Sequence, residues 1–430
     1  MSKLQELINK LCPNGVEFKP LAEVFEMRNG YTPSKNNPDF WEGGTIPWFR
    51  MDDIRENGRI LSDSIQHITP SAIKGKGLFE ANSFILATTA TIGEHALIIA
   101  DSLANQQFTN LKVRKSLSNL LVTKFIYYYM FIVDDFCKRN TNVSGFASVD
   151  MDKLKKMPFP IPPIEVQEEI VRILDSFSDY AAELQAELQA RKQQYEYYRN
   201  LLLTFNPSAY GCGTDDEQKD GVTTWGGHNY KIEWKKMGEI GTFIRGKRFV
   251  RTDIMDRGVP CIHYGDMYTY YGLYTDNTPT FLKEEKAQKM RFAQKNDIVI
   301  VAAGENKDDL GNAVAWLGEK PAAVHDACFI FRSNLYPNYI SHICRSHNYH
   351  KQIKMFANEA KICSVSGQDL QKVLIPVPEY ELQIKIASIL DRFETLVNDL
   401  TNGLPAEIAA VKDQYEYYRN KLLTFKKLTA

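Results

Sequence analysis

Two nearly identical segments, 220 residues apart, constrain this chain of 430 residues more than any other feature. QYEYYRNLLLTF at 194–205 recurs as QYEYYRNKLLTF at 414–425. Three further pairs lie 216 residues apart: VQEEIVRILDSF with LQIKIASILDRF, SVDMDKLKKMPFPIP with SVSGQDLQKVLIPVP, and VEFKPLAEV with IEWKKMGEI. Such collinear matches indicate an internal duplication, with matching edges and divergent middles.

Each copy changes its hydrophobic pattern once. Short apolar runs between Gly, Pro and Asn clusters predict strands in the middles, at 83–90, 96–100, 297–304 and 329–331. Longer runs at 120–136 and 338–357 predict buried helices. After the proline-rich exits PFPIPP and IPVP the period becomes helical. We therefore expect an α+β protein with two mixed α/β domains, each followed by a long α-helix, the two helices packing as an antiparallel coiled coil with pseudo-two-fold symmetry.

The helical segments carry apolar residues in steps of four and three, which is typical of a coiled-coil seam. The predicted seams are Ile170, Leu174, Phe177, Ala181, Leu184, Leu188, Tyr195, Tyr198, Leu202 and Phe205, and Ile386, Leu390, Phe393, Val397, Leu400, Leu404, Ile408, Val411, Tyr415, Tyr418, Leu422 and Phe425. The second seam contains two successive steps of four, at NGLPAE (402–407). Gly403 and Pro405 can break or kink the second helix there.

These patterns divide the chain into five segments. The predicted segments are a first domain at 1–163, a first long helix at 164–205, a polar linker at 206–230, a second domain at 231–378, and a second long helix with a tail at 379–430.

Charge points to the globular domains as the place for a polyanion. The whole chain has a net charge of −1, but the two domains carry +2 and +5, whereas the two helical segments carry −4 and −3. Acidic helices are poor phosphate ligands. The seven scattered cysteines predict reduced thiols rather than disulfides or zinc sites. The longest apolar run contains Glu94 and His95, so we expect no membrane span and a cytoplasmic location.

Sequence motifs for catalysis are missing from the chain. It contains no GxxxxGK[ST], GxGxxG, HExxH or GxSxG, and its eight histidines form no metal-ligand pattern. NPDF at 37–40 differs from the Asn-Pro-Pro-aromatic motif of amino-methyltransferases by Asp39, and no glycine-rich cofactor loop accompanies it. We therefore predict a binding protein without catalytic residues, metal or bound cofactor of its own.

Basic residues beside Gly, Asn and Tyr are candidates for DNA contacts, because such loops suit phosphates and base edges. The densest run is RGKRFVR at 245–251, and its counterpart in the first copy is RNGYTPSK at 28–35. The alternative is that each is a solvated basic turn. The candidate DNA-binding residues are Arg28, Tyr31, Lys35, Arg50, Lys74, Lys76, Gln107, Arg245, Lys247, Arg248, Arg251, His263 and Tyr264.

The two QYEYYRN segments also match at positions outside the seam, which exceeds what helix packing needs. Tyr197, Arg199, Tyr417 and Arg419 are therefore candidates for one partner-binding surface that the chain offers twice. The alternative is simple core packing of these segments.

The whole arrangement resembles the specificity subunit of type I restriction-modification systems. The residues that carry the resemblance are LAEVFEMRNGYTPSK, IPWFRMDDI, TATIG (89–93), NQQF (105–108) and, most specifically, SVDMDKLKKMPFPIPPIEVQEEIVRILD. The second domain departs from the glycine-turn pattern of this family, having AAGENKDDLG where the first has TTATIG.

This resemblance implies a division of labour. Each target-recognition domain reads one half of a bipartite, asymmetric site in double-stranded DNA, and the helices dock two methyltransferase (modification) subunits. Restriction subunits supply ATP-driven translocation and cleavage, so S-adenosylmethionine, ATP and magnesium belong to the partners. The alternatives are the recognition subunit of a related methylation-based defence system and a coiled-coil protein-binding scaffold. A self-sufficient methyltransferase is disfavoured by the missing cofactor loop.

Overall fold

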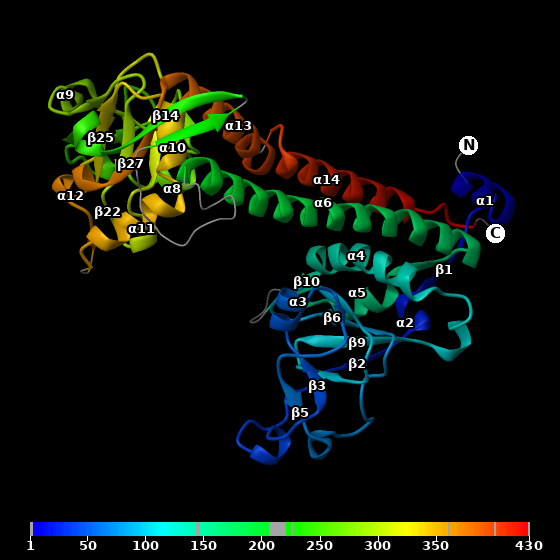
Figure 1. The fold of residues 1–430 in the computed structure, drawn as a ribbon. Coiled ribbons are helices and arrows are strands. Elements are labelled where there is room, and N and C mark those ends of the chain that lie inside the picture. The colour runs from blue at the N-terminus through cyan, green and yellow to red at the C-terminus, as the bar shows by residue number, and fades with distance from the viewer. Residues whose placement is uncertain are drawn as a thin grey trace. The chain divides into compact units, whose positions relative to one another are not determined.

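The computed structural model describes residues 3–142, 147–205, 221–225, 227–359, 362–399 and 401–428 (Figure 1). These form two compact units, one made of Met1–Glu183 with Ile408–Ala430 and the other of Leu184–Glu407. This division cuts across the segments predicted from the sequence, because each helical segment contributes its two ends to different units. Of the predicted linker, residues 206–220 and 226 lie outside the described residues.

A five-stranded sheet forms the centre of the first unit. Its order is β2–β9–β6–β7–β4, antiparallel except where β4 pairs with β7. The strands are β2 (Phe25–Asn29), β9 (Phe108–Val113), β6 (Ser83–Ala87), β7 (His95–Ile98) and β4 (Ile60–Leu61). The strands predicted at 83–90 and 96–100 are thus confirmed as β6 and β7.

The two faces of this sheet belong to two different cores. Phe84 and Leu86 of β6 pack in one buried cluster and Ile85 and Ala87 in another, as expected because side chains alternate along a strand. The second cluster includes residues of a small sheet, β5–β3–β8, made of β5 (His67–Ile68), β3 (Ile46–Phe49) and β8 (Leu103–Ala104).

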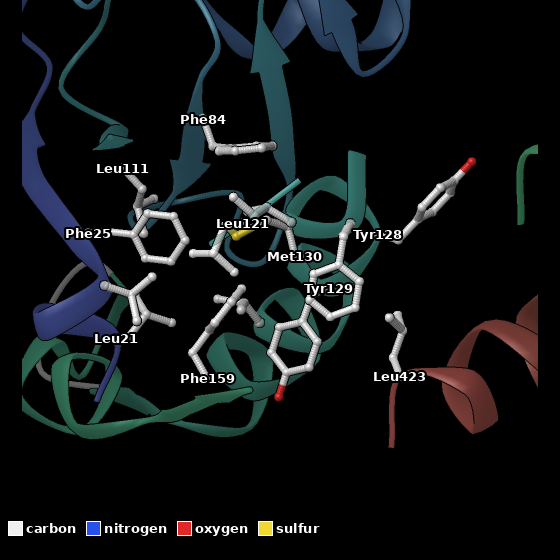
Figure 2. Close-up of a cluster of buried hydrophobic side chains, with 14 of the residues drawn as sticks. Leu21, Phe25, Phe84, Leu111, Leu121, Tyr128, Tyr129, Met130, Phe159 and Leu423 are labelled. Atoms are coloured by element: carbon white, nitrogen blue, oxygen red, sulfur yellow. The ribbon is translucent and has the colours of Figure 1, made fainter. Parts of the chain in front are cut away.

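The larger core of the first unit joins residues from both ends of the chain. Figure 2 shows Phe25, Phe84 and Leu111 of the sheet facing Tyr129 and Met130 of α4 (Thr123–Arg139), with Leu423 beside them. Helix α4 confirms the helix predicted at 120–136. Leu423, just past the end of the last helix, is 2% exposed.

The first residues of the chain are also tied to the last ones. The Val16 N–H donates to the Lys426 carbonyl at 2.9 Å, and the Leu428 N–H donates to the Val16 carbonyl at 2.8 Å. The first unit also contains α1 (Lys3–Leu11), β1 (Glu17–Pro20), α2 (Leu21–Val24), α3 (Met51–Asn57), β10 (Thr141–Asn142), β11 (Ser148–Val149), α5 (Met151–Lys156), β12 (Pro158–Ile161) and the short 3-10 helices η1 (Pro38–Phe40), η2 (Pro70–Ala72) and η3 (Lys115–Leu117). Strands β1 and β12 pair antiparallel.

The second unit repeats this architecture. Its central sheet has the order β15–β25–β21–β23–β18, and the strand equivalent to each strand of the first unit stands in the same place. The strands are β15 (Gly241–Arg245), β25 (Cys328–Ser333), β21 (Ile298–Val301), β23 (Ala313–Trp316) and β18 (Tyr274–Thr275). The predicted strands at 297–304 and 329–331 are confirmed by β21 and β25.

The smaller sheets are repeated with additions. β17 (Val259–Ile262) lies between β19 (Phe281–Leu282) and β24 (Ala322–Val324), as β3 lies between β5 and β8, and β16 (Ile254–Met255) and β20 (Phe292–Ala293) extend both edges. β14 (His228–Lys236) pairs with β27 (Leu374–Pro378) as β1 pairs with β12, and β13 (Gly221–Trp225) adds a strand. The end of the predicted linker is therefore a hairpin strand. The remaining elements are α7 (Met237–Ile240), α8 (Asp266–Thr269), α9 (Glu284–Ala287), β22 (Ala303–Gly304), β26 (Cys363–Ser364) and α12 (Gly367–Lys372).

The single helix predicted at 338–357 is wrong. The structure has two helices there, α10 (Pro337–Ile343) and α11 (His347–Phe356). The break occurs because the Ser346 side chain accepts a hydrogen bond from the Tyr349 N–H and so begins a new helix.

The first long helix is continuous, and the second is interrupted. α6 runs from Ile164 to Thr204, whereas the second helical segment forms α13 (Tyr380–Asn398) and α14 (Leu404–Leu422). The sequence left open whether Gly403 and Pro405 break or kink the second helix, and the structure shows a break just before Leu404. The Asp399 carboxylate accepts from the Thr401 N–H at 2.7 Å, and a Cβ on Gly403 would lie 2.4 Å from the Thr395 carbonyl oxygen. Leu400 lies outside the described residues.

Aromatic side chains of the predicted seams stack on one another within each unit. Phe177 stacks on Tyr418 in the first unit, with ring centroids 5.5 Å apart, and Tyr195 stacks on Phe393 in the second at 6.2 Å. In the last turn of each seam, the predicted buried residue is wrong by one position. Leu203 and Leu423 are buried, whereas the predicted Leu202 and Leu422 are half-buried.

Candidate nucleic-acid interface

Both units place a glycine where one loop crosses directly over another. The Gly30 N–H donates to the Phe108 carbonyl at 2.8 Å, and the Gly246 N–H donates to the Cys328 carbonyl at 2.9 Å. A Cβ would lie 2.2 Å from the Asn105 carbonyl oxygen at Gly30 and 2.1 Å from the His325 carbonyl oxygen at Gly246. Only glycine permits this approach, which fixes the loops 30–35 and 246–251 over the loops 104–107 and 324–327.

The crossed loops share one backbone frame. The Asn105 side-chain oxygen accepts from the Gln107 N–H at 3.0 Å, and His325 Nδ1 accepts from the Ala327 N–H at 3.2 Å. In addition, the Asn105 N–H donates to the Phe49 carbonyl, and the His325 N–H donates to the Ile262 carbonyl. Arg50 and His263 follow directly after these two carbonyl groups, so they occupy equivalent places.

A glycine turn joins the same loops. The Thr88 N–H donates to the Gln107 carbonyl, and the Ala302 N–H donates to the Ala327 carbonyl. The turns end at Gly93 (φ 76°) and Gly311 (φ 85°), conformations that favour glycine. The second turn therefore keeps the closing glycine, and it has nine residues at 302–310 where the first has five at 88–92.

In the first unit, the structure brings Tyr31 and Lys74 together. The Tyr31 hydroxyl donates to the Ala72 carbonyl at 3.0 Å and accepts from the Lys74 N–H at 2.8 Å. Tyr31 thus ties the loop 72–76 to the loop 30–35, and Lys35, Lys74 and Lys76 are exposed around this junction.

Three other candidates of the first unit are more enclosed. The Arg28 guanidinium lies over the Phe79 ring at 4.5 Å, and burial lowers its pKa. The Arg50 N–H donates to the Asp53 carboxylate at 2.6 Å, with its guanidinium 3.9 Å from Asp52. The Gln107 side-chain oxygen accepts from the Asn105 amide at 3.1 Å, so Asn105 orients it.

In the second unit, the exposed cations Lys247, Arg248 and Arg251 project from the loop that Gly246 begins. Arg245 stands at the root of this loop, where its Nε donates to the Asp326 carbonyl at 3.1 Å. Arg245 therefore holds two loops together, in contrast to the three cations beyond it.

His263 and Tyr264 lie in an aromatic cluster beside this basic loop. The His263 ring is 4.6 Å from the Tyr264 ring, 5.0 Å from the His325 ring and 5.9 Å from the Phe249 ring. Burial lowers the pKa of both histidines, although the charges of Asp266 near His263 and Asp326 near His325 act in the opposite direction. His325 and Asn105 are positioning residues that were not predicted from the sequence. Asn105 and His325 precede the strands β9 and β25 by the same number of residues, and this shared spacing could have revealed the pair.

The four partner-binding candidates divide into two kinds. Tyr197 and Tyr417 are 62% and 60% exposed. The Arg199 guanidinium instead lies 5.1 Å from the Tyr195 ring, and the Arg419 guanidinium lies 4.3 Å from the Phe131 ring of α4, where Arg419 is only 9% exposed. The two arginines therefore pack within their own units, and the two tyrosines are the members of the set that a partner can reach.

In the part of the chain that the structure describes, no group of three or more His, Cys, Asp or Glu side chains could hold a metal ion. No described helix is both long and apolar enough to cross a membrane. The cysteines at 12, 137, 261, 328, 344 and 363 are free thiols, and Cys212 lies outside the described residues.

Comparison with known families gives a match to each half of the chain. The model of the type I restriction modification DNA specificity domain matches residues 13–191 and 230–410. The chain belongs to this family. Each match covers one globular segment and most of the helical segment that follows it, in agreement with the duplication.

Two curated relatives match over nearly their full length. The chain is 36% identical to the EcoprrI specificity subunit of Escherichia coli, over 96% of this chain and 94% of the relative. It is 28% identical to the EcoR124I/EcoR124II specificity subunit of E. coli, over 99% and 98%. These comparisons favour a type I specificity subunit over a scaffold or the subunit of a different defence system.

Solved structures confirm the fold. A chain from a study of complex assembly and conformational transition of the type I restriction-modification system aligns with a TM-score of 0.61 and 15% identity, over 96% of this chain and 98% of that one. The HsdS subunit of Thermoanaerobacter tengcongensis aligns with a TM-score of 0.53 and 14% identity, over 97% and 98%. The predicted fold of two mixed α/β domains with long helices is thus confirmed.

Proposed function

We propose that each unit of this specificity subunit reads one half of a bipartite, asymmetric site in double-stranded DNA through its crossed loops and glycine turn. The observation that carries the proposal is that the two units repeat one backbone frame and place different side chains on it. Identical readers would favour a palindrome, whereas different side chains on equivalent loops suit two different half-sites.

The charge of the loops supports this assignment. Lys247, Arg248 and Arg251 in the second unit, and Lys35, Lys74 and Lys76 in the first, are exposed cations around the loop crossings. Such cations bind phosphates and set the register of a protein on a duplex, while groups on neighbouring loops reach base edges.

Methylation and cleavage belong, in this proposal, to other chains. Two methyltransferase subunits bind the helices at the surface around Tyr197 and Tyr417, and restriction subunits join the complex in the cytoplasm. Those chains bind S-adenosylmethionine, ATP and magnesium, and the specificity subunit has no catalytic residues. The matching QYEYYRN segments support two equal docking surfaces, because each presents a highly exposed tyrosine at the same position, Tyr197 or Tyr417.

Methylation mapping tests the proposal. The chain is co-expressed with its cognate methyltransferase subunit, and methylated adenines are mapped genome-wide. We expect one two-part motif with an unread spacer. Replacing residues 231–378 with the corresponding segment of a relative should change one half of the motif and preserve the other. Changes in both halves, or methylation without a two-part motif, would contradict the proposal.

A further inference from the structure

His263 and Arg50 stand at the same place on the two repeated frames. Ile262 pairs with Val324 and Phe49 pairs with Ala104 in equivalent parallel bridges, and His263 and Arg50 are the next residues along the chain. Each residue leaves its strand at the loop crossing and precedes a short helix, α8 or α3. The residue at this position therefore lies beside the crossed loops in both units.

The hydrogen bonding of His263 fixes which ring nitrogen carries the proton. The Gly265 backbone N–H donates to His263 Nδ1 at 3.2 Å. A backbone N–H can only donate, so Nδ1 must present a lone pair and the proton of the neutral ring is on Nε2. Burial lowers the pKa of His263, which favours this neutral form. Nε2 is therefore a hydrogen-bond donor of fixed identity.

The surrounding rings hold the His263 ring in place. Tyr264, His325 and Phe249 lie with ring centroids 4.6 to 5.9 Å away, so the half-buried imidazole has little freedom to turn. A donor held in this way costs little side-chain entropy when it binds.

His325, the neighbouring histidine, shows what a purely structural role looks like here. Its Nδ1 accepts from the Ala327 N–H at 3.2 Å, and its Nε2 donates to the Phe249 carbonyl at 3.1 Å. Both nitrogens of His325 thus serve the protein itself. His263 differs, because the Gly265 N–H occupies only Nδ1 and Nε2 is left to a ligand.

We propose that His263 is a specificity-determining residue, whose Nε2–H donates to an acceptor on a base edge in the major groove of the second half-site. This inference rests on the proposed function of the crossed loops as DNA readers. Purine N7, guanine O6 and thymine O4 are acceptors, whereas cytosine presents its N4 amino group, so the contacted strand disfavours cytosine. Arg50 holds the same place in the first unit, where its guanidinium suits guanine.

The chain itself suggests a matched variant. Asn105 and His325 make the same hydrogen bond to the N–H two residues later, so Asn can replace His in this turn. His263→Asn should keep the bond from Gly265 and remove the donor at the place of Nε2, because the Asn amide is shorter than the imidazole ring and does not reach that place. His263→Arg introduces the residue of the first unit. His228→Asn, in the hairpin strand β14, is the control for loss of a histidine away from the loops.

The experiment measures initial methylation rates of the complete methyltransferase complex. The duplexes carry the wild-type recognition site, found by methylation mapping, with each base pair replaced in turn. For His263→Asn we expect discrimination against cytosine to fall about tenfold at one position of the second half, the value of one lost hydrogen bond. For His263→Arg we expect guanine to be preferred there. The first half and the His228→Asn profile should not change.

Three results would overturn the inference. One is an unchanged base profile in both His263 variants. Another is a uniform loss of rate at all positions, because that would show a structural role. Thermal unfolding and co-purification with the methyltransferase subunit are measured for each variant, and a loss of folding in His263→Asn would likewise assign His263 to the turn. If the wild-type complex recognises no two-part site, the proposed function fails instead.

Discussion

Leu423 should stabilise a fold whose other core residues lie more than 240 positions earlier in the chain. It is 2% exposed and packs in the core that contains Phe25 and Tyr129 (Figure 2). Replacing a buried leucine with alanine costs about 3 to 5 kcal/mol through lost burial and the remaining cavity. For a unit of this size that corresponds to a fall of roughly 6–20 °C in its Tm.

Hydrogen exchange measured by mass spectrometry can locate this loss. In Leu423→Ala we expect faster exchange in α4 and β9 of the first unit, with β25 of the second unit unchanged. Leu203→Ala is the matched control, because Leu203 is also 2% exposed but belongs to the second unit. Leu422→Ala should cost less, since Leu422 is only half-buried. Equal exchange in both units for Leu423→Ala, or a larger effect for Leu422→Ala, would refute the reasoning.

Three further perturbations test the interface, the partner surface and one ion pair. A triple variant should weaken DNA binding: Lys247→Ala, Arg248→Ala and Arg251→Ala. Titrations at several salt concentrations should show that the slope of log K against log salt concentration becomes shallower by up to about 3, and an unchanged slope would exclude phosphate contacts. The double variant Tyr197→Ala and Tyr417→Ala should reduce the binding of methyltransferase subunits, measured by native mass spectrometry, without lowering the Tm. A full complex of two methyltransferase subunits with one specificity subunit would show that these tyrosines do not belong to the docking surface. Hydrogen bonds and charge from Arg172 and Lys3 hold the pKa of Glu169 at about 2, below its unfolded value of 4.5. The ionised Glu169 therefore stabilises the fold above pH 4.5, and this stabilisation is lost as the pH falls towards 2. The Glu169→Gln variant should show a flatter acid unfolding curve than the wild type, and identical curves would refute this.

The sequence predicts the elements whose patterns are local. Alternating and continuous apolar runs marked β6, β7, β21 and β25, because a strand in a buried sheet needs apolar residues on both faces. The glycine and proline at 403 and 405 marked the break between α13 and α14. In contrast, the break between α10 and α11 depends on one serine cap, which the continuous apolar pattern around it conceals.

The basic loops of the candidate site stand out in the sequence, whereas their supporting residues do not. RGKRFVR and RNGYTPSK are conspicuous by composition, but their place at the loop crossings comes from the structure. Tyr31, Arg245 and His325 make hydrogen bonds to carbonyl groups of loops between 41 and 81 residues away. Such contacts require the three-dimensional path of the chain, which periodicity and composition do not contain.

The division of the chain into units has a consequence for synthesis on the ribosome. Domains usually fold in the order in which they are made, from the N-terminus onward. Here the second unit is a single continuous stretch, Leu184–Glu407, whereas the first unit needs Ile408–Ala430 to complete its core. The unit that is translated first is therefore finished last, and its open core must wait, in the nascent chain, until the whole second unit has been made.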